Sequence, residues 1–343
     1  MPRRSEAEAR LADVAVVAFA QSNIFGERER NEVEILMPVV REVFDKVGLT
    51  KNDIGFTCSG TSDYLAGQPF SFVSALDAVG AWPPIVESHV EMDGAWALYE
   101  AWVRLQHGDL DTALVYAVGK SSMGDLLDVL SLQLDPYVVT PLWPDPVSLA
   151  ALQARAYLES SGKTEDDLAA VAARAGRKID TNSDYIASPL RRHDCPPITD
   201  GAAAIVLAVG DRARELCERP AWISGVDHRI EQHALGARDL TRSASTKLAA
   251  EKAGASSGPI DVAELHAPFT HQELILRDAI GLDGAEVNPS GGALKANPLM
   301  VAGLERIGEA AQRVIDGNAK RALAHATSGP CLQQNLVCVM EGR

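Results

Sequence analysis

Three segments in the last quarter of the chain carry residue types that can act on a carbonyl group. His266 lies in residues 264–269, and an imidazole, whose unperturbed pKa is about 6.5, can serve as a base near neutrality. Asn297, in residues 288–298, offers an amide donor that can polarise a carbonyl oxygen. Three glycines suit tight loops in which backbone N–H groups face the reacting carbonyl: Gly291, Gly292 and Gly329.

The elements that must position these segments alternate between apolar, β-branched runs and helical patterns, which predicts parallel sheets covered by helices. Apolar periodicity predicts helices at residues 31–48, 94–107, 150–160, 165–178, 211–219, 270–280 and 301–317. Apolar runs predict strands at residues 53–58, 112–120, 222–226, 322–326 and 335–340. Between residues 120 and 197 the sequence becomes proline-rich and aromatic, as expected of a cap inserted between two strands.

Composition narrows the class of protein. A chain of 343 residues with 46% hydrophobic composition can bury a large core and is long enough to be an enzyme alone. Its net charge of -15 and its lack of a basic run argue against nucleic acid as a partner. The five cysteines are odd in number and form no Cys-x-x-Cys pair, so we expect reduced thiols and no metal site.

The N-terminal residues are basic at first but are not followed by an apolar signal core. The sequence contains no apolar run that approaches the ~20 residues needed to cross a bilayer. We therefore expect a cytoplasmic protein without a membrane span.

Residues 13–20, 112–120 and 197–207 resemble strands of the thiolase superfamily, and the last of these is similar to the acid-Gly-Ala-Ala strand of that family. Residues 264–269, 288–298 and 325–331 follow the order of its C-terminal active-site loops. The resemblance is strongest to the thiolase-like lipid-transfer proteins of steroid and lipid catabolism. They are relatives of the sterol-carrier-protein thiolases, and some of them are retro-aldolases.

The resemblance implies an α/β thiolase fold with two duplicated halves, each of βαβαβαββ type, in a five-layer αβαβα arrangement. The strand order of the halves should match. The N-terminal half would cover residues 1–210, including a short cap at about 121–197, and the C-terminal half residues 211–343. The family pairs through the strand near its nucleophile, so we expect a dimer interface near residues 87–94.

In this family a cysteine at the head of a buried helix takes up the acyl group. The matching residues 87–98 contain no cysteine, and alignment on Gly94 puts Glu91 at that position. A carboxylate cannot replace a thiolate in thioester exchange. Glu91 is either a base or an acid favoured by the helix dipole, and the same alternatives hold for His89 and Asp93.

The remaining family positions are also altered. Asn297 replaces the histidine of the family's Gly-His-Pro, and His325 stands where thiolases have a second cysteine and sterol-carrier-type relatives a histidine. His266 lies in the loop that helps to bind the thioester oxygen in the family. The alternative is that His266 has only a structural role. His271 is expected to be its partner or a capping residue, and Lys295 to meet phosphate or solvent. Cys331 is out of register and is interpreted as a buried small residue.

These features favour retro-aldol cleavage of a β-hydroxyacyl-CoA, with His266 as base. We expect its imidazole to lie beside Asn297 and His325, which would hold the thioester oxygen. Coenzyme A enters as part of the substrate, its site must be locally positive, and no other cofactor is needed. The alternative is a non-catalytic subunit in a homodimer or a hetero-oligomer. Its partner would be a thiolase-like paralogue or a zinc-ribbon OB-fold acyl-CoA-binding protein. A thiolase that uses another cysteine is a third possibility.

Overall fold

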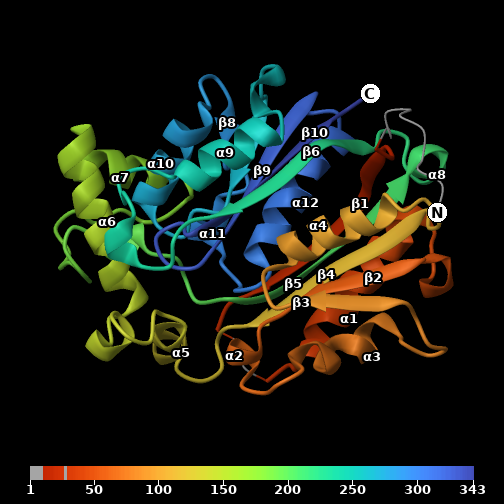
Figure 1. Cartoon of the computed structure of the whole chain (residues 1–343), viewed down its shortest axis with the longest axis horizontal. Coiled ribbons are helices and arrows are strands. Elements are labelled where there is room, and N and C mark those ends of the chain that lie inside the picture. The colour runs from red at the N-terminus through yellow and green to blue at the C-terminus, as the bar shows by residue number, and fades with distance from the viewer. Residues whose placement is uncertain (1–10, 27–28) are drawn as a thin grey trace, which may run out of the picture.

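A computed structural model describes residues 11–26 and 29–343 (Figure 1). The expectation about the basic N-terminus falls on residues 1–10, outside the described part. Among the described residues, no helix combines the length and the apolar character that a membrane crossing requires.

Ten strands of the described chain form two groups of five with the same internal order. The first group contains β1 (Val14–Ile24), β2 (Phe56–Gly60), β3 (Glu87–Val90), β4 (Thr112–Lys120) and β5 (Asp200–Val209). The second contains β6 (Ala221–Ile230), β7 (Val262–Leu265), β8 (Glu286–Val287), β9 (Arg321–Ser328) and β10 (Gln334–Glu341). The spatial order is β3-β2-β4-β5-β1-β6-β10-β9-β7-β8, so the second group mirrors the first. The expected match in strand order is confirmed.

The two groups join into one continuous sheet of ten strands. β1 and β6 pair antiparallel through Ala15 with Trp222 and Val16 with Ala221. Each of these strands lies at the edge of its own group, and this two-residue pairing joins the two edges near the start of β1 and of β6. Within each group, parallel pairs and antiparallel pairs occur together, as β2 with β4 and β4 with β5 illustrate.

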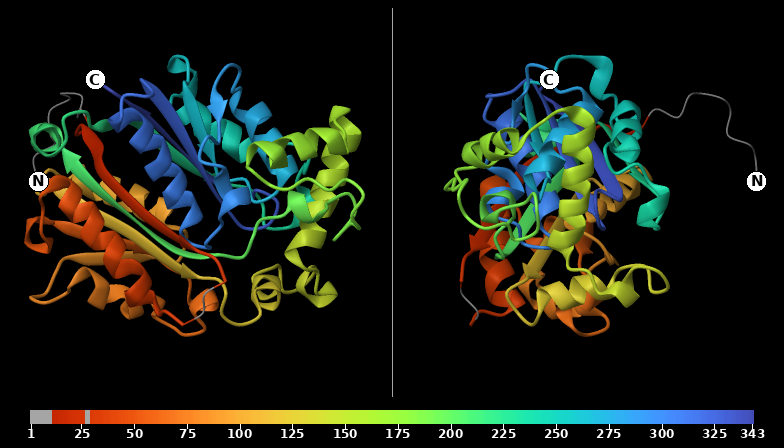
Figure 2. Two further views of the ribbon diagram at one scale, coloured as in Figure 1. Left: turned by 180° about the vertical axis from the view of Figure 1, so that it is seen from behind. Right: turned by 90° about the vertical axis from the view of Figure 1, so that its left-hand side faces the viewer.

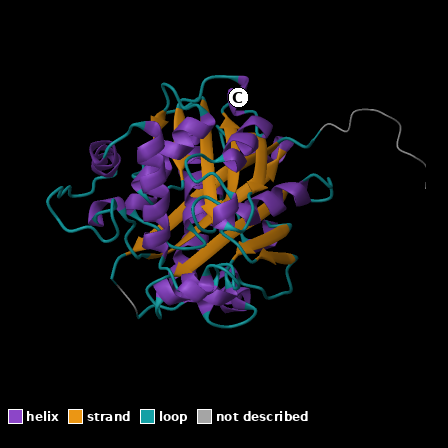
Figure 3. Cartoon of the chain, turned by 60° about the vertical axis from the view of Figure 1, so that its left-hand side comes forward, coloured by secondary structure: helices purple, strands orange, loops and turns teal. Residues whose placement is uncertain are grey.

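Helices lie outside and between the two strand groups, giving five layers (Figures 1 and 3). The outer face of the first group is covered by α1 (Glu32–Val47) and α3 (Leu76–Val79). The middle layer is α4 (Gly94–Leu105) and α12 (Ala302–Ile315), and α9 (Ala244–Lys252) and α10 (Thr270–Ile280) cover the second group. Three further short helices are α2 (Asp63–Ala66), α8 (Gly210–Leu216) and α11 (Gly292–Lys295).

Local sequence explains where several of these helices begin and end. Asn31 caps α1 by accepting from the Glu34 N–H, the Glu34 carboxylate accepts from the Asn31 N–H, and Gly48 ends the helix in the left-handed region. In the middle layer, α12 packs so close to β1 that a Cβ atom added to Gly308 would lie 2.1 Å from the Phe19 ring. Only glycine permits that approach.

The insertion between β4 and β5 forms a helical cap. It contains α5 (Leu126–Leu132), α6 (Pro146–Ser161) and α7 (Glu165–Arg174), at the end of the molecule opposite the C-terminus (Figure 2). Helix α6 begins earlier than expected because Asp145 caps it, accepting from the Val147 and Ser148 N–H groups, with Pro146 in its first turn. Helix α7 ends at Arg174 rather than at residue 178, and α5 was not expected.

Candidate functional site

The imidazole of His266 lies between two loops at the end of β7. Its Nε2 is 3.1 Å from Asn297 Oδ1, and the Thr327 N–H donates to its Nδ1 over 3.4 Å. Because Nδ1 accepts, the ring proton is on Nε2 and is donated to Asn297. The His266 N–H donates to the His325 carbonyl at 3.1 Å, which fixes the end of β7 against β9. The expected contact between His266 and Asn297 is therefore present.

Asn297 is held from the other half of the molecule. Its backbone N–H donates to Thr199 Oγ1 over 2.9 Å, just before β5. Its side-chain Oδ1 is used by His266, and its Nδ2 has no hydrogen-bond partner within residues 11–26 and 29–343. The side chains of His266 and Asn297 are 5% and 6% exposed, so the pair is nearly closed off from solvent. The arrangement leaves one oriented amide donor unused.

His325 does not join this pair through its side chain. Its Nε2 is 3.0 Å from Asn335 Oδ1, and its Nδ1 is buried without a partner among the described residues. His271 is also fully buried, with Nε2 at 3.2 Å from Gln153 Oε1 of the cap. His271 therefore contacts the cap rather than His266.

Burial controls the ionisation of all three histidines. It lowers the pKa of His266 to about 3, and the proximity of His325 acts in the same direction, whereas the bond to Asn297 opposes the shift. Burial lowers the pKa of His271 to about 3 and that of His325 to about 4. Each imidazole is consequently neutral at pH 7.

The head of α4 is occupied by acids with different environments. Glu91 is exposed, and its Oε1 accepts from the Asp63 N–H over 2.6 Å, without a hydrogen bond to His266. Asp93 is 2% exposed and accepts from the N–H groups of Ala95, Gly303 and Leu304 at 2.8, 2.9 and 3.0 Å. Asp93 thus joins the first turns of α4 and α12. Of the two acids, Asp93 is the buried one.

The loop that contains Gly291 and Gly292 is held in place by hydrogen bonds to Ser290. Gly291 precedes α11 with φ +95°, and the Gly292 N–H donates to Ser290 Oγ over 3.2 Å. Lys295 is exposed, and its Nζ donates to the Ser290 carbonyl at 3.3 Å. Gly329, with φ +74°, lies in the turn between β9 and β10 against Gln333. The Gly292 N–H is therefore already bonded and does not point to an empty oxyanion site.

A buried charged cluster supports that loop and was not predicted from the sequence. The fully buried Glu264 accepts from the Ser290 N–H at 3.0 Å and from its hydroxyl at 2.6 Å. Arg306 Nη1 donates to the same hydroxyl over 2.7 Å and lies 3.3 Å from Glu264 Oε2. One feature of the sequence could have indicated this cluster: two adjacent charged residues, Glu305 and Arg306, lie within the apolar pattern of the helix predicted at 301–317.

None of the five cysteines is on α4, and all are free thiols. Burial raises the pKa of Cys331 to about 11 and that of Cys58 to about 12. Cys331 is 7% exposed, and its Sγ contacts the Leu149 carbonyl. Among the described residues, no group of three or more His, Cys, Asp and Glu side chains is placed to hold a metal ion.

Comparison with known proteins agrees with this architecture, although no family model matches the chain. An acetyl-CoA acetyltransferase of Methanothermobacter thermautotrophicus is 29% identical over 301 residues, covering 72% of this chain and 78% of that protein. A 17-hydroxy-3-oxo-4-pregnene-20-carboxyl-CoA lyase of Mycobacterium tuberculosis is 38% identical over 96 residues, 23% of this chain and 25% of that one. The solved Ltp2-ChsH2(DUF35) aldolase has a TM-score of 0.78 at 20% identity, covering 96% of this chain and 98% of that chain.

The strand order, the five layers and this structural likeness define a thiolase fold. In sequence the chain resembles proteins of the thiolase superfamily, and two of these relatives are named for acyl-CoA compounds, acetyl-CoA and a pregnene carboxyl-CoA.

Proposed function

We propose that the chain catalyses retro-aldol cleavage of a β-hydroxyacyl-CoA with a steroid or other bulky side chain. The observation that carries this proposal is the buried pair of His266 and Asn297 in a site without a cysteine at the head of α4. Such a pair can serve proton transfer and oxyanion binding but offers no sulfur to form an acyl-enzyme.

In the proposed reaction, the β-hydroxyl loses its proton to a base and the bond between the α and β carbons breaks. Its electrons form the enolate of the shorter thioester, while the β carbon becomes a ketone or aldehyde. Protonation of the enolate at the α carbon then releases the shorter acyl-CoA. Asn297 Nδ2 is suited to donate to the thioester oxygen as negative charge develops there, because His266 already orients this amide through Oδ1.

His266 is the proposed base. Because burial lowers its pKa to about 3, the imidazole is neutral at physiological pH. Its acceptor nitrogen is Nδ1, which in this proposal exchanges the 3.4 Å contact with the Thr327 N–H for the proton of the substrate hydroxyl. An imidazole of such low basicity accepts the proton only as the carbon–carbon bond breaks, so transfer and cleavage are concerted in this proposal. His325 is proposed to act indirectly, through its backbone contact with His266.

Two comparisons support carbon–carbon cleavage over thiolysis. The mycobacterial relative is named a lyase acting on a steroid carboxyl-CoA, and the structural neighbour is named an aldolase. The acetyl-CoA acetyltransferase relative favours the acyl-CoA class without distinguishing the two reactions. Acyl transfer is disfavoured here because the buried thiols have raised pKa values.

The second candidate function is a non-catalytic subunit that supports an active partner. It is favoured by the low exposure of His266 and by large exposed apolar side chains near β3, such as Tyr64, Phe70 and Trp82, which are 58%, 69% and 81% exposed. The structural neighbour, the Ltp2-ChsH2(DUF35) aldolase, carries the names of two components. A thiolase-like homodimer or a hetero-oligomer would cover these side chains.

The test is release of ketone and short acyl-CoA from a synthetic β-hydroxyacyl-CoA, measured with and without the neighbouring gene products. His266→Ala should lower the rate by ~100-fold or more. His266→Gln keeps a donor for Asn297 but no base, so it should be as slow as the alanine variant if His266 accepts the proton. If glutamine restores the rate, His266 only positions Asn297. If the complex is active and both variants match the native chain, the partner performs the chemistry.

A further inference from the structure

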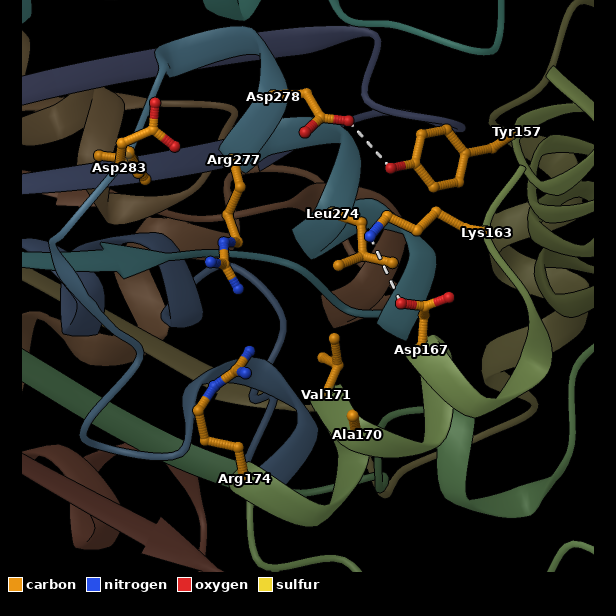
Figure 4. A pocket seen from close by; sticks show the side chains of 11 residues that line it. Tyr157, Lys163, Asp167, Ala170, Val171, Arg174, Leu274, Arg277, Asp278 and Asp283 are labelled. Carbon is orange, nitrogen blue, oxygen red and sulfur yellow. Dashed lines mark hydrogen bonds and ion pairs between the residues drawn. The ribbon is translucent and has the colours of Figure 1, made fainter. Parts of the chain in front are cut away.

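A second site lies away from His266, where the cap meets α10. A cavity of about 250 Å³ is bounded by the C-terminal part of α6, by α7 and by α10 (Figure 4). Its basic side chains come from both walls: Lys163 and Arg174 from the cap, and Arg277 from α10. Its small volume and its charged walls fit a small polar ligand better than an acyl chain.

Of the three cations that line this cavity, Lys163 and Arg174 have ion-pair partners, and Arg277 has none among the described residues. Arg174 forms an ion pair with the buried Glu273, whereas the guanidinium group of Arg277 has no hydrogen bond or ion pair within residues 11–26 and 29–343. Figure 4 shows the two guanidinium groups pointing toward one another across the cavity. Burial raises the pKa of Glu273, whereas the charges of Arg174 and, more weakly, Arg277 lower it, so a single carboxylate serves both guanidinium groups.

The acids of the cavity are engaged elsewhere or open to solvent. Asp167 accepts from the Thr164 N–H at the start of α7 and pairs with Lys163 at 3.4 Å. Asp278 accepts from the Tyr157 hydroxyl at 2.9 Å, and Asp283 is exposed. None of these carboxylates forms an ion pair with Arg277 within the described ranges.

We infer that this cavity binds a phosphate group between Arg174 and Arg277. A guanidinium group presents donors in a planar fork that matches two oxygens of a phosphate, and two forks from opposite walls can hold one dianion. The phosphate can be free inorganic phosphate or the phosphate of a nucleotide such as the end of coenzyme A. The inference does not depend on the proposed reaction, because binding is measured without turnover.

The surroundings of the two arginines decide which one to mutate. Arg174 neutralises Glu273, whose other oxygen accepts from Asn288 Nδ2 at 2.7 Å, and Asn288 Oδ1 accepts from the Leu265 N–H at 2.6 Å. Loss of Arg174 would therefore leave a buried carboxylate unpaired next to the loop of His266. Arg277 makes no hydrogen bond or ion pair in the described chain and acts on Glu273 only as a weaker, more distant charge, so its substitution should remove ligand binding without unfolding the protein.

The experiment is calorimetric titration of the full chain with inorganic phosphate, adenosine 3′,5′-bisphosphate and coenzyme A at constant ionic strength. We expect saturable binding of at least one of them, weakened by ~10-fold or more in Arg277→Gln, since a charge-assisted hydrogen bond is lost. Arg41→Gln is the matched control. Arg41 is an exposed arginine on α1, also without an ion pair in the described chain, and its variant should bind like the native protein.

The outcomes separate the sources and can overturn the inference. Equal affinity for inorganic phosphate and coenzyme A identifies free phosphate as the ligand chemistry. Tighter binding of the bisphosphate and coenzyme A, lost in Arg277→Gln, identifies the nucleotide end. Failure of all three ligands to bind at millimolar concentration, or equal binding by Arg277→Gln and the native chain, overturns the site. A folded Arg277→Gln variant is verified by its unchanged thermal midpoint without ligand.

Discussion

Replacing Asp93 should destabilise the protein more than any change of an exposed acid, because its carboxylate joins two helices of the middle layer. Asp93→Ala removes the acceptor of three backbone N–H groups, those of Ala95, Gly303 and Leu304. Each buried donor left without a partner costs about 1–3 kcal/mol, and entry of water relieves part of that cost. We expect the free energy of unfolding to fall by about 3–6 kcal/mol.

Asp93→Asn supplies a graded test of the same contacts. The Oδ1 atom accepts from Ala95 and Leu304, whereas Oδ2 accepts from Gly303. An amide keeps one oxygen but turns an NH₂ group toward the Gly303 N–H, so two contacts survive and one donor faces another. The expected loss is about 2 kcal/mol, between those of the native and alanine proteins.

The assay is urea unfolding at pH 7, followed by circular dichroism and by tryptophan fluorescence. Trp96, 5% exposed in the first turn of α4, reports directly on the helix that Asp93 caps. Asp109→Asn, which breaks an exposed pair with Arg104, is the control and should leave the midpoint unchanged. A loss below about 1 kcal/mol in Asp93→Ala, or a larger loss in the asparagine variant, would refute the reasoning.

Three further predictions concern the histidine, the cysteine and the assembly. Because the folded pKa of His266 is about 3, below its ordinary 6.5, its contribution to stability is complete above pH 6.5 and is lost as the pH falls toward 3. In the native protein, His266 should make the free energy of unfolding decrease by about 1.4 kcal/mol for each pH unit between pH 6 and 4. The His266→Gln variant should lack this part of the pH dependence. Cys331→Ser should leave the cleavage rate unchanged, and native Cys331 should react slowly with iodoacetamide at pH 7, since its pKa is about 11. Light scattering should give a dimer through the surface near β3, and a stable monomer at micromolar concentration without a partner would contradict it.

Much of the local structure could be predicted because its causes lie within a few residues of each other. The strand at 112–120 and the helix at 270–280 are predicted with the bounds of β4 and α10. Asn31 and Gly48 mark the ends of α1 because capping depends on neighbouring backbone groups. Strand β7 is missing from the predicted strands, because its four residues are too few to show a pattern.

The candidate site could be predicted only in part. The contact between His266 and Asn297 was expected from the order of the family's loops, and it is present at 3.1 Å. The contributions of Thr327 and Thr199 were not expected, because each reaches the site from a strand end distant in sequence. The alternative acids Glu91 and Asp93 could not be ranked either, since both lie within one turn before Gly94.

By itself, the sequence determined the types and order of the elements, the absence of a cysteine at residues 87–98 and the grouping of polar residues in three C-terminal segments. These depend on short-range periodicity, capping and residue identity, which need no knowledge of distant contacts. Only the tertiary structure decided which groups are buried together. It places Asp93 between two helices, lowers the pKa of His266 by excluding water, and turns Arg174 and Arg277 toward one cavity. Desolvation and charge proximity arise from packing between segments far apart in the chain, so no local pattern carries them.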